Sequence, residues 1–154
     1  MDFLHERQFS LEELMPLIRE QLKAGQSVRF SPRGTSMLPM LRQGRDSVVL
    51  SPLPERLKKY DIPLYQRKNG QYVLHRIVKT GEVYTCTGDN QTLLEPGITR
   101  EQMIGIVTAF YRGEKRCEVT SLPYRMYCRL WHWSRPVRWL WRGGKSWIRR
   151  LLRK

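Results

Sequence analysis

The sequence predicts a mainly β protein: a small coiled or barrel-like antiparallel sheet with an N-terminal helix and a C-terminal basic, Trp-rich helical tail. Apolar residues recur at helical spacing early in the chain, and the period changes to two after Gly25. The composition changes again near Ser121, where acidic residues stop and tryptophans begin. We therefore expect a helix packed on the core within residues 1–26, a β domain over 27–120 and a tail over 121–154.

The first expected element is a helix from about Leu11 to Ala24. Ser10 and Glu13 have the spacing of a capping box, in which each side chain accepts a hydrogen bond from the other residue's backbone N–H. Apolar residues then follow at the spacing of one helix face: Leu11, Leu14, Ile18 and Leu22. Gly25 can end the helix, because glycine adopts the left-handed conformation at little cost.

Short strands separated by tight turns follow the helix. The Asn69-Gly70 pair predicts a hairpin, because a type I′ turn needs positive φ at both central residues and these two residue types tolerate it. The expected strands cover residues 27–31, 47–50, 62–67, 71–79, 82–86, 104–111 and 116–120.

Charge and composition narrow the class of protein. The chain has 154 residues and a net charge of +14, and the segment from Ser121 onward holds ten Lys or Arg, all five Trp and no acid. No run approaches the roughly 18 apolar residues of a membrane-spanning helix, and residues 1–10 lack the apolar region of a signal peptide. We expect a cytoplasmic protein whose cysteines are reduced and show no metal-ligand spacing: Cys86, Cys117 and Cys128. No metal or cofactor is expected.

Ser36 and His75 are candidates for a nucleophile and its base. Ser36 lies in the Gly/Pro-containing turn over residues 34–41, and a serine hydroxyl becomes a useful nucleophile only when a base takes its proton. Its alternative role is that of a plain turn residue. His75 interrupts an apolar strand over residues 72–78, where it is either a hydrogen-bonded core residue or a base in a cleft. By the two-residue period of a strand, His75 shares a face with Val73 and Ile77.

Two carboxylates are candidates for orienting His75. Asp89 follows a glycine at the end of an expected strand, and Glu95 lies a few residues further on. A triad needs such a third group to hold the base and stabilise its protonated form. The alternative for Asp89 is an ordinary turn, which aspartate suits. The spacing does not choose between the two acids.

Three short motifs occur in a fixed order: Ser36-Met37-Leu38-Pro39, then His75-Arg76-Ile77, then Gly88-Asp89-Asn90 followed by Glu95. This order resembles the signal peptidase I superfamily, in the Ser–His branch of the endoplasmic-reticulum-type enzymes, over roughly residues 27–112. The resemblance implies a serine endopeptidase that cleaves a peptide or precursor, with Ser36 as nucleophile, His75 as general base, and Asp89 or Glu95 as the carboxylate.

The chain departs from the family at several places. Gly34 stands where relatives commonly carry a serine that donates to the oxyanion, and Glu95 stands where an aspartate is usual. We also expect no membrane-spanning anchor of the kind that the family carries, because no run of this sequence has the required apolar length. A second hypothesis is therefore a catalytically inactive binding or regulatory module that keeps the fold.

Residues 121–154 allow three interpretations. They can form an in-plane anchor on the anionic inner face of a membrane, because tryptophan favours the headgroup region and basic residues favour anionic lipid. They can bind nucleic acid through basic and stacking aromatic side chains. They can also be a helical cap that buries its tryptophans on the core. Near the end of this segment, residues Trp147, Ile148, Leu151 and Leu152 gather on one expected helical side.

Overall fold

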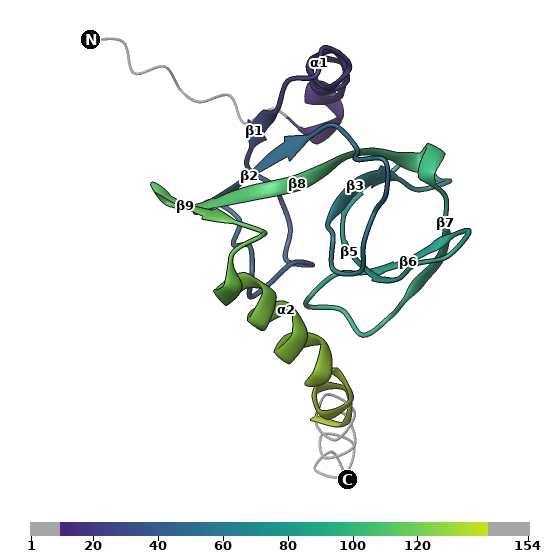
Figure 1. The fold of residues 1–154 in the computed structure, drawn as a ribbon, viewed down its shortest axis with the longest axis vertical. Helices are drawn as coiled ribbons and strands as arrows, with labels where there is room; N and C mark the ends of the chain where they lie inside the picture. The colour runs from purple at the N-terminus through teal and green to yellow at the C-terminus, as the bar shows by residue number, and fades with distance from the viewer. Residues whose placement is uncertain (1–9, 142–154) are drawn as a thin grey trace, which may run out of the picture.

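The structure is a computed structural model that describes residues 10–141. Two antiparallel sheets lie between an N-terminal helix and a C-terminal helix (Figure 1). The elements are α1 (Leu11–Lys23), β1 (Val28–Phe30), β2 (Asp46–Ser51), β3 (Pro63–Gln66), β4 (Tyr72–Leu74), β5 (Arg76–Lys79), β6 (Tyr84–Thr87), β7 (Glu95–Ile98), the 3₁₀ helix η1 (Arg100–Gln102), β8 (Met103–Arg112), β9 (Lys115–Glu118) and α2 (Leu122–Trp133). The expected fold class is confirmed, although the sheets of this part of the chain do not close into a barrel.

The larger sheet is built around β8, its longest strand. Its strand order is β1-β2-β8-β3-β4, and β9 pairs with β8 beside β3. The register shifts by one residue where β2 passes from Val49 to Leu50, so that Thr108 of β8 is bulged. A bulge increases the local twist of a strand, which helps the sheet to coil. Strands β1 and β4 end up as the two outer strands of the path.

The smaller sheet has the order β5-β6-β7. The expected single strand over residues 71–79 is broken at His75, so that β4 belongs to the larger sheet and β5 to the smaller one. Strand β7 was not expected from the sequence, because Pro96 and Gly97 lie inside it and read as a turn. It pairs with β6 through Tyr84 opposite Ile98 and Cys86 opposite Glu95.

Local sequence signals account for the first helix and the hairpin. The capping box at Ser10 and Glu13 is present, with both reciprocal hydrogen bonds formed. The hairpin joins β3 to β4 as expected, but only Gly70 of the Asn69-Gly70 pair has a positive φ, of 88°. The turn is therefore not type I′. The Asn69 side chain instead accepts a hydrogen bond from the Gln71 N–H at 3.0 Å.

Two apolar cores hold the elements together. The larger one joins α1, the larger sheet, the turn after β1, and α2; the smaller one lies beneath the smaller sheet and includes Tyr65 and Ile77. Gly105 allows α1 to approach β8 closely, because a Cβ there would lie 3.0 Å from the Leu22 Cδ1 atom and 2.9 Å from the Ser51 carbonyl oxygen. A larger residue at this position would push α1 away from the sheet.

Helix α2 packs one face on the larger core. Tyr124 and Cys128 are buried there, and the chain remains helical over residues 135–141. This part of the tail packs on the core as a helical cap, but Trp133, Trp139 and Trp141 remain exposed, so the expected burial of the tryptophans is wrong for these three residues. The expected amphipathic group over residues 147–152 lies outside the described residues, as do residues 1–9. Within the described range, no helix combines the length and the apolar character that crossing a bilayer requires.

Candidate active site

Ser36 lies on a tight turn between β1 and β2. The turn is closed by hydrogen bonds from the Leu38 N–H to the Thr35 carbonyl and from the Leu41 N–H to the Met37 carbonyl. Met37 is buried in the larger core and fixes the turn to the body of the protein, while Ser36 itself remains half-buried. The buried apolar neighbours thus hold the serine at the surface of the fold.

The Gly88-Asp89-Asn90 segment packs directly against this turn. The Asn90 N–H donates to the Ser36 carbonyl at 2.8 Å, and the Asn90 side-chain amide donates to the Thr35 carbonyl at 3.1 Å. At Gly88 a Cβ atom would lie 2.5 Å from the Ser36 carbonyl oxygen, so only glycine fits without a shift of the backbone. Two of the three motifs therefore meet at the serine turn.

Ser36 and His75 line the same cleft, which has a volume of about 640 Å³. His75 is the residue between β4 and β5, and only 2% of its surface is exposed. Among the described residues the Ser36 hydroxyl makes no hydrogen bond, to His75 or to any other group. Such bonds are often loose in enzymes without substrate and tighten when the reacting complex forms.

Glu95 is the carboxylate at His75. Its Oε1 atom lies 3.2 Å from His75 Nδ1, and the Tyr65 hydroxyl lies 3.3 Å from the same nitrogen. Because Nδ1 faces the carboxylate, the neutral ring carries its proton there and presents the unprotonated Nε2 as the basic atom. Nε2 makes no hydrogen bond to a described residue.

Glu95 is itself held by two further side chains. The Tyr65 hydroxyl donates to Glu95 Oε2 at 2.8 Å, and Arg67 donates to both carboxylate oxygens. Burial raises the pKa of Glu95, but the hydrogen bonds from Arg67 and Tyr65 lower it by more. The pKa of Glu95 therefore lies below its ordinary value. Glu95 therefore stays ionised at neutral pH.

The protonation of His75 follows from two opposing effects. Burial disfavours the charged ring and lowers the pKa of His75, while the Glu95 carboxylate raises it; burial prevails. His75 is therefore neutral at pH 7 and able to accept a proton. Burial and the hydrogen bond to Glu95 raise the pKa of Tyr65, so its hydroxyl remains a donor.

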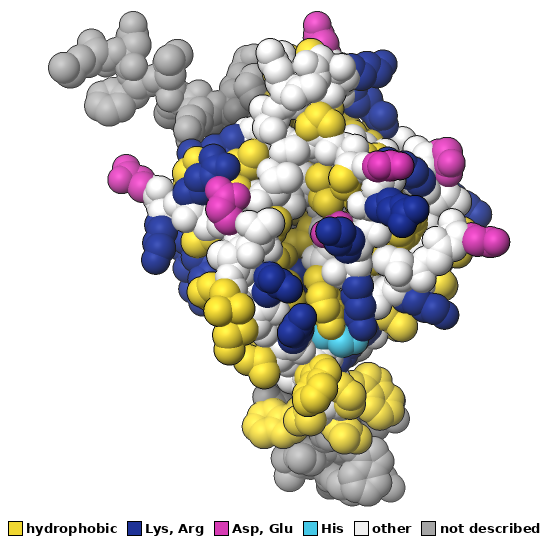
Figure 2. All heavy atoms as spheres, in the orientation of Figure 1, with side chains coloured by type: hydrophobic (Ala, Val, Ile, Leu, Met, Phe, Trp, Pro, Cys, Tyr) yellow, Lys and Arg dark blue, Asp and Glu magenta, His cyan; other side chains and the backbone are white. Residues whose placement is uncertain are grey.

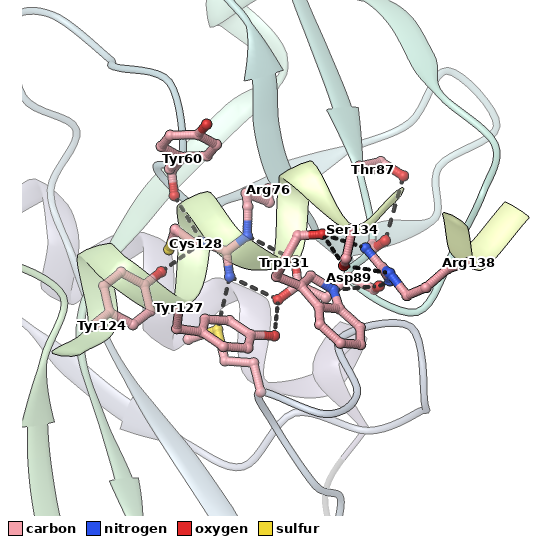
Figure 3. A network of polar contacts seen from close by, with 12 residues as sticks. Tyr60, Arg76, Thr87, Asp89, Tyr124, Tyr127, Cys128, Trp131, Ser134 and Arg138 are labelled. Atoms are coloured by element: carbon pink, nitrogen blue, oxygen red, sulfur yellow. Dashed lines mark hydrogen bonds and ion pairs between the residues drawn. The ribbon is translucent and has the colours of Figure 1, made fainter. Parts of the chain in front are cut away.

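Asp89 occupies a different environment. Both of its oxygens accept hydrogen bonds from Arg76, at 2.7 and 2.8 Å, and Oδ2 also accepts one from the Tyr127 hydroxyl. Figure 3 shows Arg76 enclosed by Asp89 and the side chains of α2, with Trp131 and Arg138 directed at the Asp89 backbone. The Asp89 side chain is thus committed to Arg76, and Glu95 is the acid in contact with His75.

Few hydrogen-bond donors are available beside Ser36 to stabilise an oxyanion. Gly34 has a φ of 96° and donates its N–H to the Gln43 side chain at 2.7 Å. Thr35 is exposed, and its hydroxyl makes no hydrogen bond to a described residue. The Ser36 N–H likewise has no acceptor within the described part of the chain, which leaves it free to donate to an oxyanion.

Sequence analysis did not predict the residues that donate hydrogen bonds to Glu95. Tyr65 and Arg67 lie at the end of β3, and their partner Glu95 lies on a strand that was not expected. The available signal was the hairpin, which brings the residues before it alongside β4 and His75. No group of three His, Cys, Asp or Glu side chains arranged to hold a metal ion occurs in residues 10–141.

Comparisons of the chain with protein-family models, with curated proteins and with solved structures return no match.

Proposed function

We propose that this protein is a serine endopeptidase that cleaves a peptide or precursor substrate in the cytoplasm. The observation that carries the proposal is the shared cleft of Ser36 and His75, with the Glu95 carboxylate at His75 Nδ1. A serine, a neutral buried histidine and an ionised carboxylate in this order are the groups that acyl transfer needs. The resemblance to the Ser–His signal peptidases supports the same assignment.

In the proposed reaction the Ser36 oxygen attacks the carbonyl carbon of the scissile peptide bond. His75 Nε2 takes the hydroxyl proton and then gives it to the leaving amine as the C–N bond breaks. Water, activated by the same histidine, hydrolyses the resulting ester and releases the acid product. Glu95 stabilises the protonated ring, and the Ser36 N–H donates to the oxyanion.

The borders of the cleft support a peptide substrate. Phe30 of β1 and Leu74 of β4 both line it, and these two strands are the outer strands of the larger sheet. An outer strand offers unpaired N–H and C=O groups to an extended peptide, so a substrate can be held by main-chain hydrogen bonds next to Ser36. The described cysteines are all free thiols, which supports a reducing compartment and hence a cytoplasmic precursor, such as one with a leader segment.

A serine-reactive phosphonate tests this proposal. We expect one covalent adduct by intact mass, absent from Ser36→Ala and slowed at least about a hundredfold in His75→Ala. Ser31→Ala is the matched control, because Ser31 lines the same cleft and is exposed, and it should label like the wild type. An adduct that persists in Ser36→Ala would contradict the assignment of the nucleophile.

The second candidate is a binding module without turnover. Two observations favour it: Gly34 supplies no side-chain donor to the oxyanion, and the Ser36 hydroxyl is not hydrogen-bonded to His75. Such a module would bind extended peptides along β1 and β4 yet leave them uncut and resist the phosphonate. Mass spectrometry of a peptide library after incubation distinguishes the two, because only the enzyme generates new termini.

A further inference from the structure

Helix α2 and its continuation to residue 141 expose a long row of apolar side chains. These residues are separated by three or four positions, so at 3.6 residues per turn they fall within an arc of roughly 100° on one side of the helix. The exposed residues of this arc are Leu122, Met126, Leu130, Trp133, Val137 and Leu140. We call this surface the outer arc.

Packing within residues 10–141 does not account for the outer arc. The opposite side of the helix supplies the residues that contact the core and Asp89, including Tyr124, Cys128 and Trp131. Trp133, in contrast, is 82% exposed. Figure 2 shows hydrophobic side chains gathered along the lower part of the molecule, where α2 runs in Figure 1. An exposed apolar surface of this extent marks an interaction site.

Basic side chains lie next to the outer arc. Arg125 and Arg129 of α2, together with Lys58 and Lys59, line a groove of about 640 Å³ between the helix and the larger sheet. All four residues are exposed. Figure 2 shows dark blue side chains beside the hydrophobic ones on this face. The surface therefore combines an apolar strip with a cationic border.

We propose that this surface docks on an anionic lipid bilayer. A helix lying in the bilayer interface buries its apolar side among the acyl chains and places Lys and Arg at the headgroups, with tryptophan at the boundary. The outer arc and its cationic border have this arrangement. The proposal concerns a different surface from the cleft, so it does not depend on the proposed peptidase activity.

The composition of the surface disfavours two other occupants. Nucleic acid would contact basic and stacking side chains, but the outer arc is mainly aliphatic and would gain nothing from phosphates. A second copy of the chain would bring two molecules of net charge +14 together with their cationic borders adjacent. Both remain distinguishable outcomes of the experiment.

Co-sedimentation of the full chain with vesicles tests the proposal. We expect binding to vesicles of phosphatidylcholine mixed with phosphatidylglycerol, and binding at least about tenfold weaker to phosphatidylcholine alone. The double variant Leu130→Glu/Trp133→Glu should lose at least about tenfold in partitioning to the mixed vesicles. Arg125→Glu/Arg129→Glu should lose a similar factor, most clearly at low salt.

Matched variants at other exposed positions control for nonspecific effects. Val83→Glu adds a charge at an exposed apolar residue outside α2, and Arg19→Glu/Lys23→Glu reverses two exposed charges on α1. The controls should bind the vesicles within about twofold of the wild type. Residues 142–154 are the same in every variant, so the differences report on the described surface. Circular dichroism and urea unfolding show whether each variant is folded.

Three results would overturn the proposal. The first is vesicle binding by the outer-arc variants equal to that of the wild type. The second is binding to duplex DNA with none to anionic vesicles. The third is a concentration-dependent dimer, seen by light scattering and lost in Leu130→Glu/Trp133→Glu, in a protein that does not bind vesicles. Because labelling of Ser36 is measured separately, loss of membrane binding and loss of the proposed catalysis are distinct results.

Discussion

The Glu95 carboxylate lies 3.2 Å from His75 Nδ1, although Glu95 belongs to the smaller sheet and His75 directly follows β4 of the larger one. Glu95 reaches the histidine because β7 pairs with β6, which in turn pairs with β5 directly after His75. Arg67 and Tyr65 then fix the carboxylate from the larger sheet. The contact thus joins the two sheets beside the cleft that His75 lines.

Glu95→Gln is predicted to reduce the rate of phosphonate labelling by about a hundredfold to ten-thousandfold with little loss of stability. The amide keeps the shape of the side chain but removes the charge that stabilises protonated His75. It also replaces one acceptor oxygen by a donor NH₂ group, which favours the wrong tautomer of the ring. The measurement is the second-order labelling rate by intact mass. A rate within twofold of the wild type would show that Glu95 does not orient the histidine.

The labelling rate should rise with pH and reach a plateau near neutrality. His75 acts as a base only when neutral, and burial places its pKa below the ordinary value of 6.5, despite the opposing effects of Glu95 and Asp89. The rate is therefore predicted to be constant above pH 6.5 and to fall as the pH passes below the lowered pKa. Glu95→Gln should move this fall to still lower pH, because it removes a group that raises the pKa.

The same shift in the pKa of His75 has a consequence for stability. The unfolded chain takes up a proton on this ring near pH 6.5, whereas the folded chain does so only at lower pH. The contribution is fully present above the unfolded pKa and is lost as the pH falls through the folded one. His75→Gln should reduce the acid sensitivity of the unfolding free energy between those two values, as measured by urea titrations over that range.

Gly88→Ala is predicted to slow labelling of Ser36 while the protein still folds. The added Cβ would meet the Ser36 carbonyl oxygen at 2.5 Å, so the serine turn must shift relative to His75. We expect at least about a tenfold loss in labelling rate and about 1–3 kcal/mol of destabilisation. Gly81→Ala is the control, because its Cβ would meet its nearest neighbour, the Val83 carbonyl oxygen, at an ordinary 3.5 Å. Equal labelling of the two variants would contradict this account.

Sequence reasoning succeeded where local rules decide the structure. The capping box at Ser10 and the hairpin at Gly70 depend on residues within a few positions of each other, and both formed. The prediction of a type I′ turn at Gly70 was wrong, because the Asn69 side chain closes the turn by its own hydrogen bond. The order of the three motifs led us to expect Ser36 and His75 at one site, and both residues line the same cleft. Hydrophobic periodicity could not have predicted this, because it carries no information on distances between remote segments.

The missed features all depend on contacts between distant segments. The two-residue period runs unbroken through His75, so it cannot reveal that the chain changes sheets there. Strand β7 contains Pro96 and Gly97 and is stabilised by its pairing with β6 rather than by its own propensity. The sequence could not choose between Asp89 and Glu95, because it does not show that the Arg76 guanidinium donates hydrogen bonds to both oxygens of Asp89.

The Arg76–Asp89 ion pair is predicted to be a large contributor to stability. Each of the two residues is only 3% exposed, and Arg76 also donates to Tyr124 and to the Tyr60 carbonyl. Asp89→Asn leaves the buried guanidinium without its counter-charge, which costs about 3–5 kcal/mol of unfolding free energy. The measurement is urea unfolding at neutral pH, followed by tryptophan fluorescence.

Glu118→Gln is the matched control for this variant. Glu118 pairs with Arg116 at 2.6 Å, but about half of each side chain is exposed, so water screens the interaction. We expect no measurable change in its unfolding midpoint. If Asp89→Asn unfolds at the same urea concentration as Glu118→Gln, the buried pair contributes little to stability. If Asp89→Asn is destabilised but still labels at Ser36 in its folded fraction, Asp89 stabilises the fold without being the acid that orients His75, as its contacts with Arg76 and α2 predict.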